Sequence, residues 1–159
     1  LELTKGKIPS LKLTVLFSSQ EETGGTGAKT AAFSSMPRYA IAVDVGFGND
    51  PYTDKTQTIE LSKGPSIGIS PILDRDFMKE LKELAKENGI PFQHDVMSGR
   101  TGTNADSINV TGSGVKTALL SLPLRYMHTG AEIVNIDDIE NTAKLISAYL
   151  LKKEAEFNA

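Results

Sequence analysis

Carboxylate side chains follow two apolar stretches of the sequence, at the points where predicted strands end. Glu21 and Glu22 come after the apolar residues 11–18 and precede a glycine-rich turn, and Asp44 closes the apolar residues 39–43. Two adjacent carboxylates in one cleft can divide their work, because one can bind a metal ion while the other accepts a proton. The alternative for an isolated Glu-Glu pair is a solvated acidic turn.

Asp44 and His128 are the other candidates for chemistry. A buried carboxylate such as Asp44 is costly unless it is paired or metal-bound, although an Asp in this place can also cap the next turn. His128 follows the apolar residues 115–122. Neutral imidazole is the commonest transition-metal ligand, but a lone histidine is more often structural or solvent-exposed. The second histidine, His94, lies on an alternating strand, and we predict that it faces solvent.

The elements that must position these side chains alternate between strand and helix. Residues 11–18 and 39–45 predict buried strands, and residues 28–34 between them predict a helix, so the segment resembles a β-α-β unit. Further strands are predicted over 58–61, 66–69, 92–97 and 115–122, and helices over 74–88 and 137–152. A polar loop spans 98–109. This alternation indicates a layered α/β fold.

The two long helices carry sequence signals for their ends and faces. In the first, Phe77, Leu81, Leu84 and Ala85 share one face, and Gly89 ends the helix. In the second, Asp137 and Glu140 predict a capping box. Its predicted buried face comprises Ile139, Ala143, Ile146 and Leu150.

Composition excludes several classes of partner. The chain has 159 residues, a net charge of −3 and no cysteine. Its length indicates about one domain, and because no basic cluster is present we expect no nucleic-acid partner. The apolar stretches are too short to span a bilayer and no signal peptide is evident, so we expect no membrane partner and a cytoplasmic location. The first strand starts within about a dozen residues of Leu1, and we expect a chain that begins in mid-domain.

Together the candidates are more specific than any one of them. Three of the sites follow apolar strands, and in an open α/β sheet the carboxyl ends of the strands converge on one edge. Carboxylates plus an imidazole at such an edge form a ligand set suited to Zn, Co or Mn.

Four segments in the same order carry a resemblance to a known family. They are residues 19–24 (SQEETG), 99–106 (GRTGTNAD), 122–129 (LPLRYMHT) and 132–141 (EIVNIDDIEN). The sequence resembles the glutamyl and deblocking aminopeptidases that build hollow tetrahedral particles, some of which are labelled endoglucanase or cellulase. The resemblance covers nearly the whole chain.

The resemblance implies a fold and a metal site. The fold would be the mixed sheet with helices on both faces of phosphorylase/hydrolase-like zinc peptidases, incomplete in this chain. Residues 1–153 would form the C-terminal part of one catalytic domain and 154–159 a frayed tail. The N-terminal part and an inserted dimerisation domain would be absent. Glu22, Asp44 and His128 would each bind one ion of a zinc or cobalt pair, with a further His and a bridging Asp supplied from upstream.

The resemblance also implies an activity. A water molecule activated by two metal ions would hydrolyse N-terminal residues from peptides, with Glu21 as general base. The loop from Ser98 to Asp106 would line the pocket for the first side chain. The complete protein would be a homo-oligomer of dimers assembling to a dodecamer, and this chain alone would be inactive. The sequence departs from the family pattern at Thr23, Asn104 and Gly130, none of which is a ligand.

Two other functions remain possible at this stage. A glycoside hydrolase (endoglucanase) could use Glu21 with Asp44 or Glu22 as its carboxyl pair, but such enzymes usually add an aromatic platform for the sugar, and this chain has no Trp. The second alternative is a non-catalytic fragment or assembly subunit, because the ligand set within the chain is incomplete.

Overall fold

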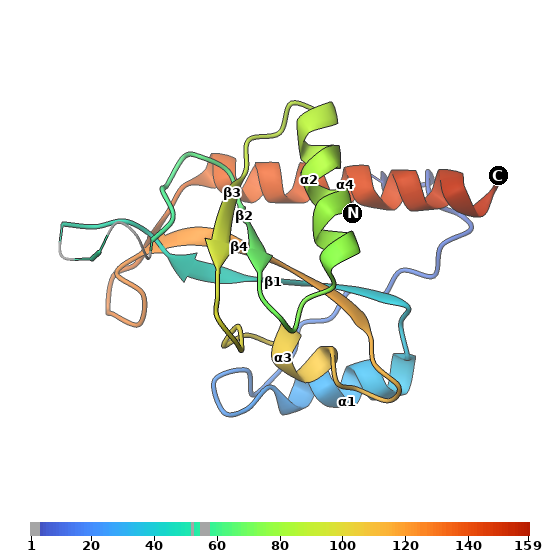
Figure 1. The fold of residues 1–159 in the computed structure, drawn as a ribbon, viewed down its shortest axis with the longest axis horizontal. Helices are drawn as coiled ribbons and strands as arrows, with labels where there is room; N and C mark the ends of the chain where they lie inside the picture. Colours follow the sequence, from blue (N-terminus) through green and yellow to red (C-terminus); the bar gives the residue numbers. More distant parts are fainter. Residues whose placement is uncertain (1–3, 52, 55–57) are drawn as a thin grey trace.

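A mixed β-sheet with helices on both faces forms the body of the protein (Figure 1). The computed structural model describes residues 4–51, 53–54 and 58–159. The strands are β1 (Tyr39–Phe47), β2 (Ser66–Ile69), β3 (Gln93–Val96), β4 (Lys116–Arg125) and β5 (Ile133–Val134). The helices are α1 (Thr26–Ser35), α2 (Arg75–Glu87), α3 (Ala105–Ile108) and α4 (Ile136–Phe157). The predicted α/β class is therefore confirmed.

Strands of both directions make up the sheet. In the described part of the chain the order is β1-β4-β2-β3, and β5 pairs with β4. β1 and β4 are parallel, and their register places Asp44 beside Ser121. β2 runs antiparallel to β4 and parallel to β3. Since β1 and β4 run the same way, the segments that follow them leave the sheet at the same edge.

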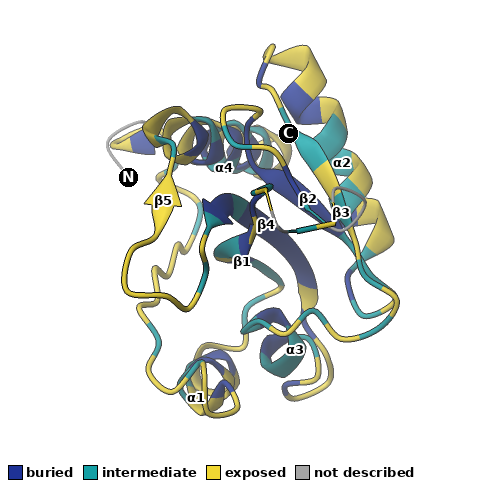
Figure 2. Ribbon diagram, turned by 90° about the vertical axis from the view of Figure 1, so that its left-hand side faces the viewer, coloured by how far each residue is buried: buried dark blue, intermediate teal, exposed yellow. Residues whose placement is uncertain are grey.

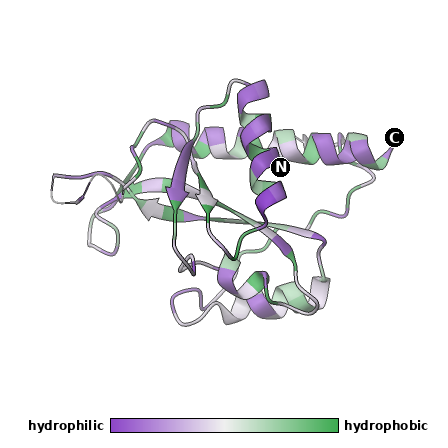
Figure 3. Ribbon diagram, viewed as in Figure 1, coloured by the Kyte–Doolittle hydropathy of each residue, from purple (hydrophilic) through white to green (hydrophobic). Residues whose placement is uncertain are grey.

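Helices α2 and α4 cover one face of the sheet. The N-cap of α2 is Asp74, whose side chain accepts a hydrogen bond of 2.8 Å from Phe77 N. The buried residues of α2 are Phe77, Leu81, Leu84 and Ala85, as its sequence periodicity predicts. Figure 3 shows α2 and α4 alternating between hydrophilic and hydrophobic positions, the pattern of helices with one covered face. The rings of Phe77 and Tyr149 stack at 4.6 Å between the two helices.

The expected start, face and end of α4 need correction. The N-cap is Asn135, whose side chain accepts a hydrogen bond from Asp137 N, so the capping box does not form. The buried positions are Asp138, Thr142, Leu145, Ser147, Tyr149 and Glu154, whereas Ile139 is exposed. Packing of Leu145 and Tyr149 into the main core rotates the helix relative to its most apolar stripe.

The expected frayed tail, residues 154–159, is also corrected. Helix α4 continues to Phe157, and the Glu154 carboxylate accepts hydrogen bonds of 3.0 and 3.1 Å from Ser10 N. The Asn158 side chain adds a hydrogen bond of 2.9 Å to the same carboxylate. A contact distant in sequence therefore holds the end of the helix, and no local pattern signals it.

The predicted strand over residues 11–18 is wrong in the structure. These residues form no strand, and Leu13, Val15, Leu16 and Phe17 are exposed, with 95% of Phe17 accessible to solvent. Strand formation needs a partner for the backbone N–H and C=O groups. Within the described residues, no strand pairs with 11–18, and β1 pairs only with β4. Val43 and Phe47 on β1 are exposed as well, whereas β2 and most of β4 are buried (Figure 2).

The predicted strand over residues 58–61 is wrong too. Ile59 instead forms a single parallel bridge with Gly48, and its N–H donates to Phe47 O at 2.9 Å. The following turn is held elsewhere, because Asp138 accepts hydrogen bonds from Ser62 N and Gly64 N at 2.8 and 2.7 Å. The segment thus lies beyond the carboxyl end of β1.

The opposite face of the sheet carries α1 and α3 (Figure 1). Ala42 and Leu119 from the sheet pack with Ala105 and Leu73, and Ala28 and Ala32 of α1 pack with Ile108 and Val115. Small side chains dominate these contacts, so the helices cover this face only in part. Among the described residues, no helix is long and apolar enough to cross a membrane.

Candidate active site

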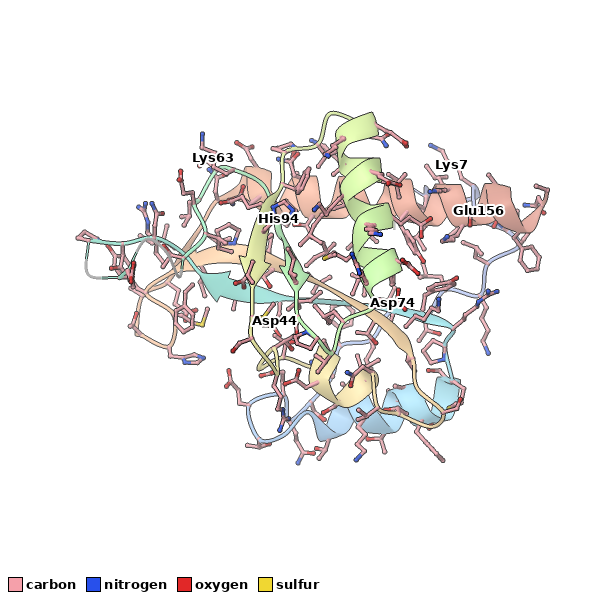
Figure 4. The ribbon with its side chains drawn as sticks, in the orientation of Figure 1. Lys7, Asp44, Lys63, Asp74, His94 and Glu156 are labelled. Atoms are coloured by element: carbon pink, nitrogen blue, oxygen red, sulfur yellow. The ribbon has the colours of Figure 1, made fainter. Side chains whose placement is uncertain are left out.

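A cleft of about 330 Å³ opens on the α3 side of the sheet, beyond the carboxyl ends of β1 and β4. Glu21, Glu22, Asp44 and His128 all line it. They come from three segments: the loop before α1, strand β1, and the turn after β4. Figure 4 shows Asp44 on the side of the sheet that faces α3. The structure therefore brings the four sequence-predicted site residues together.

The loop before α1 places Glu21 and Glu22 at the rim of the cleft. Gln20 adopts a left-handed φ of 60°, and its carbonyl accepts a hydrogen bond of 2.8 Å from Gly25 N. The two carboxylates lie within this tight turn. Gly27, in the first turn of α1, lets the helix pack onto Ser19, because a Cβ at that position would lie 2.4 Å from Ser19 O. The close contact holds the loop against the helix.

The turn after β4 presents His128. Tyr126 and His128 both have left-handed φ angles, 60° and 63°. Such conformations cost about 1–3 kcal/mol each and concentrate at functional sites. The His128 N–H donates to Glu132 Oε1 at 2.7 Å, and Arg125 Nη2 donates to Asn49 Oδ1 at 3.2 Å. These contacts fix the turn, so the imidazole points at the carboxylates across the cleft.

The imidazole and one carboxylate are close enough to share a metal ion. His128 Nε2 lies 3.5 Å from Glu22 Oε1, and the two side chains are 69% and 76% exposed. Zinc binds His N and Glu O at about 2.0–2.2 Å, so two ligands of one tetrahedral ion are about 3.4 Å apart. The observed separation matches this distance between two ligands. The donor types and their spacing therefore fit a divalent metal.

The ligand set is nonetheless incomplete. Among residues 4–51, 53–54 and 58–159, no group of three or more His, Cys, Asp or Glu side chains is placed to hold one ion. Asp44 stands apart from the Glu22–His128 pair. The Glu22–His128 pair and the separate Asp44 carboxylate could therefore bind two neighbouring ions if further ligands completed each site.

The acidic groups perturb one another. Desolvation, followed by the negative charges of Asp44 and Glu22, raises the pKa of Glu21, whereas the charge of His128 opposes this shift. Burial, with a smaller contribution from Glu22, raises the pKa of Asp44, and the hydrogen bond from Val45 N at 2.8 Å opposes it. Mutual repulsion of carboxylates in a cleft favours a cation bound between them.

The loop over residues 99–106 forms another wall of the cleft. The Asp106 carboxylate accepts hydrogen bonds from Thr101 N, Thr101 Oγ1 and Gly102 N at 2.8, 2.7 and 3.1 Å. Asn104 Nδ2 donates to Ser18 Oγ at 2.9 Å, which ties this loop to the one that carries Glu21. Thr101, Gly102 and Thr103 face the cleft.

Sequence reasoning missed one cleft carboxylate, Asp95. It lies on β3, between the exposed His94 and Val96, and it lines the cleft. His94 faces solvent as predicted. The alternation of side chains along a strand could have identified Asp95, since it must point away from the side that His94 occupies.

Comparison with known proteins places the chain in a family. A sequence model of the M42 glutamyl aminopeptidases matches residues 1–145. The chain belongs to this M42 family. A curated lysyl aminopeptidase from Pyrococcus furiosus is 39% identical over 137 residues, which cover 86% of this chain and 39% of that protein.

Two solved peptidase structures agree with the fold. An aminopeptidase from the archaeon Desulfurococcus kamchatkensis is 33% identical, with a TM-score of 0.79 over 85% of this chain and 40% of that one. The TET1 peptidase of Pyrococcus horikoshii, described as assembling into a tetrahedron or a large octahedral shell, is 34% identical, with a TM-score of 0.67. The match covers 84% of this chain and 39% of the Pyrococcus horikoshii chain. The chain spans about two fifths of the length of its relatives.

Proposed function

We propose that this chain forms part of the catalytic domain of a metal-dependent aminopeptidase. The observation that carries the proposal is the shared cleft of Glu21, Glu22, Asp44 and His128 in a member of the M42 family. Because the chain spans about two fifths of its relatives' length, we assign the activity to a complete protein that supplies the remaining ligands, and we expect residues 1–159 alone to be inactive.

Three side chains would hold the metal ions. Glu22 and His128, at 3.5 Å, are spaced to bind one ion, and Asp44 would bind the second. Zinc or cobalt is the metal best suited to this mixture of carboxylate and imidazole. When bound, such ions polarise a carbonyl group and lower the pKa of water.

Glu21 would act as the general base. Its carboxylate is at the cleft rim beside Asp44 and Glu22, and desolvation and these charges raise its pKa. A raised pKa strengthens the carboxylate as a proton acceptor and brings it nearer to neutrality, where a group can both take and return a proton. Glu21 would remove a proton from the attacking water and deliver it to the leaving amine.

The surroundings of the cleft support a peptide substrate and an assembled protein. Thr101 to Thr103 form a polar wall beside the apolar Leu119 and Met97, which can enclose an N-terminal side chain. The exposed apolar residues 13–17 and the open edge of β1 need cover, which the rest of the catalytic domain would supply. We also propose a homo-oligomer of dimers in the complete protein, in line with the description of the Pyrococcus horikoshii relative, and a cytoplasmic location.

Hydrolysis of aminoacyl-nitroanilides by the complete protein tests this function. We expect turnover that a chelator abolishes and added zinc or cobalt restores. The glycoside hydrolase alternative predicts the opposite pattern, because its carboxyl pair works without a metal. Chelator-resistant cleavage of a β-glucan, with no release of nitroaniline, would establish that alternative and overturn the aminopeptidase.

A further inference from the structure

The turn that carries Glu21 and Glu22 (residues 18–25, here the glutamate turn) has few hydrogen bonds of its own. The Gly25 N–H donates to Gln20 O at 2.8 Å and to Glu21 O at 3.1 Å. The residues before the turn form no strand, and most of the turn is exposed. These local bonds fix the shape of the glutamate turn but not its position in the cleft. The positions of both carboxylates therefore depend on contacts with other elements.

Helix α3 and its N-cap residue contact the glutamate turn at both ends. At the start of the turn, Asn104 Nδ2 donates to Ser18 Oγ at 2.9 Å. At its end, Ser107 Oγ donates to Gly24 O at 3.4 Å. Gly25 packs closely against the same helix, since a Cβ there would lie 2.7 Å from Ser107 Oγ and 3.3 Å from Asn104 Oδ1. The two glutamates thus lie between two points at which α3 holds the chain.

The side chain of Asn104 makes this contact instead of capping its own helix. Asparagine is among the best N-cap residues, yet Asn104, the N-cap of α3, makes no capping hydrogen bond with its side chain. Its Oδ1 is buried and accepts no hydrogen bond within the described part of the chain. A buried acceptor without a donor is costly. The contact with Ser18 therefore orients this side chain, and the helix does not.

Helix α3 is itself fixed to the body of the protein. Figure 2 shows α3 between α1 and the sheet. Ala105 is fully buried in a cluster with Leu119 of β4, and Asn109 Nδ2 donates to Ile72 O at 3.0 Å. The residues just before the helix, 101–103, line the cleft. A segment anchored on the sheet therefore holds the glutamate turn in place.

We propose that Asn104 is a positioning residue that holds Glu21 and Glu22 in the cleft through its hydrogen bond to Ser18. Asn104 does not itself line the cleft, so it acts through the glutamate turn. Without this bond the turn keeps its own hydrogen bonds but loses its attachment at the start. Misplacement of a reacting group by about 1 Å can lower a rate about 100-fold. This inference rests on the proposed aminopeptidase function, since it concerns the base and one metal ligand of that site.

The test compares the complete zinc-loaded protein with its Asn104→Ala variant on the aminoacyl-nitroanilide that the wild type hydrolyses fastest. We expect kcat to fall about 10- to 100-fold, the usual effect of removing a group that orients a metal ligand, and KM to change less than about threefold. Zinc affinity, measured by competition with a chelator, should weaken about 10- to 100-fold through Glu22. Ser18→Ala removes the same bond and should reproduce both effects. The double variant should lose no more than either single variant.

Asn109→Ala is the matched control, because it removes the same side chain from the other end of α3. Asn109 also makes one amide hydrogen bond, at 3.0 Å, and its Oδ1 is likewise buried without a donor among the described residues. Its partner, Ile72 O, lies outside the glutamate turn. Both alanine variants should lower the urea midpoint to a similar extent. Only Asn104→Ala should change kcat and zinc affinity.

The outcomes separate this inference from the proposed function. Equal kcat and zinc affinity in Asn104→Ala and Asn109→Ala would refute the positioning role while the aminopeptidase function stands. A raised KM with unchanged kcat and zinc affinity would also refute it, and would show that Asn104 acts through the cleft wall at residues 101–103. Absence of nitroanilide hydrolysis by the zinc-loaded wild type would overturn the aminopeptidase function. The zinc affinities of the variants would then still decide whether Asn104 positions Glu22.

Discussion

Replacement of Asp138 by alanine should destabilise the wall of the cleft. The Asp138 carboxylate is fully buried at the start of α4 and accepts hydrogen bonds from Ser62 N and Gly64 N at 2.8 and 2.7 Å. Gly64 is buried, so its N–H would lose its partner at a cost of about 1–3 kcal/mol. Ser62 is exposed, so its N–H would regain water and the net loss would be about 0.5–1.5 kcal/mol. The expected total is about 1.5–4.5 kcal/mol.

Asp137→Ala is the matched control for this prediction. Asp137 occupies the same first turn of α4 and has the same charge, but it is exposed and its side chain holds no loop. Each variant loses about 0.3–1 kcal/mol of interaction with the helix N-terminus, so only Asp138→Ala should show the larger effect.

The assays are urea unfolding and amide hydrogen exchange of the complete protein. We expect a lower unfolding midpoint, and exchange at Gly64 at least about 10-fold faster, which corresponds to about 1.4 kcal/mol. The loop from Ile59 to Gly64 lines and borders the cleft, so kcat/KM should fall with it. Equal stability of the Asp138 and Asp137 variants, with unchanged exchange at Gly64, would refute the assignment of this carboxylate as the anchor of the loop.

Three further changes probe the site. Glu21→Gln should reduce kcat about 100- to 10,000-fold and leave the metal content of the complete protein intact, as measured by plasma emission spectrometry, because a general base is not a ligand; loss of metal instead would exchange the roles of Glu21 and Glu22. Gly27→Ala should lower zinc affinity and kcat/KM together, since its Cβ would lie 2.4 Å from Ser19 O and displace the loop that carries both glutamates, whereas Lys29→Ala on the exposed side of α1 should have no effect. Asp44→Asn should stabilise the metal-free protein at pH 7. Burial raises the pKa of Asp44, so the contribution of this carboxyl to stability is present below the usual value of 3.8 and is lost as the pH rises through the raised pKa. In urea titrations, the gain in stability should vanish at acidic pH and become a loss when zinc is added. A variant that is less stable than the wild type at pH 7 without metal would contradict the raised pKa of Asp44.

Elements whose partners lie nearby in sequence could be predicted. The periodicity of α2 and its cap at Asp74 are local signals, and the structure follows them. The apolar run that forms β4 is buried, and the apolar run that forms β1 pairs with it in parallel. The positions of Glu21, Glu22, Asp44 and His128 after apolar stretches, together with the family resemblance, predicted their meeting in one cleft, although residues 11–18 form no strand.

Features that depend on distant contacts could not be predicted. Residues 11–18 have the composition of a strand, but a strand forms only where another strand pairs with it, and no described strand pairs with these residues. The buried face of α4 includes Asp138, which is polar and accepts hydrogen bonds from the loop at Ser62 and Gly64. Asp95 drew no attention because an acidic residue on a short edge strand resembles a solvated one. Its place in the cleft follows from the alternation of side chains along β3.

The position of bound zinc tests the account most directly. Crystals of the complete protein, grown with zinc, should show anomalous scattering at the zinc absorption edge. We expect one peak within about 2.0–2.2 Å of Glu22 and His128, and a second at the same distance from Asp44, the usual lengths of Zn–O and Zn–N bonds. Peaks elsewhere on the molecule, with Glu22, Asp44 and His128 all free of metal, would contradict the assignment of this cleft as a metallopeptidase active site.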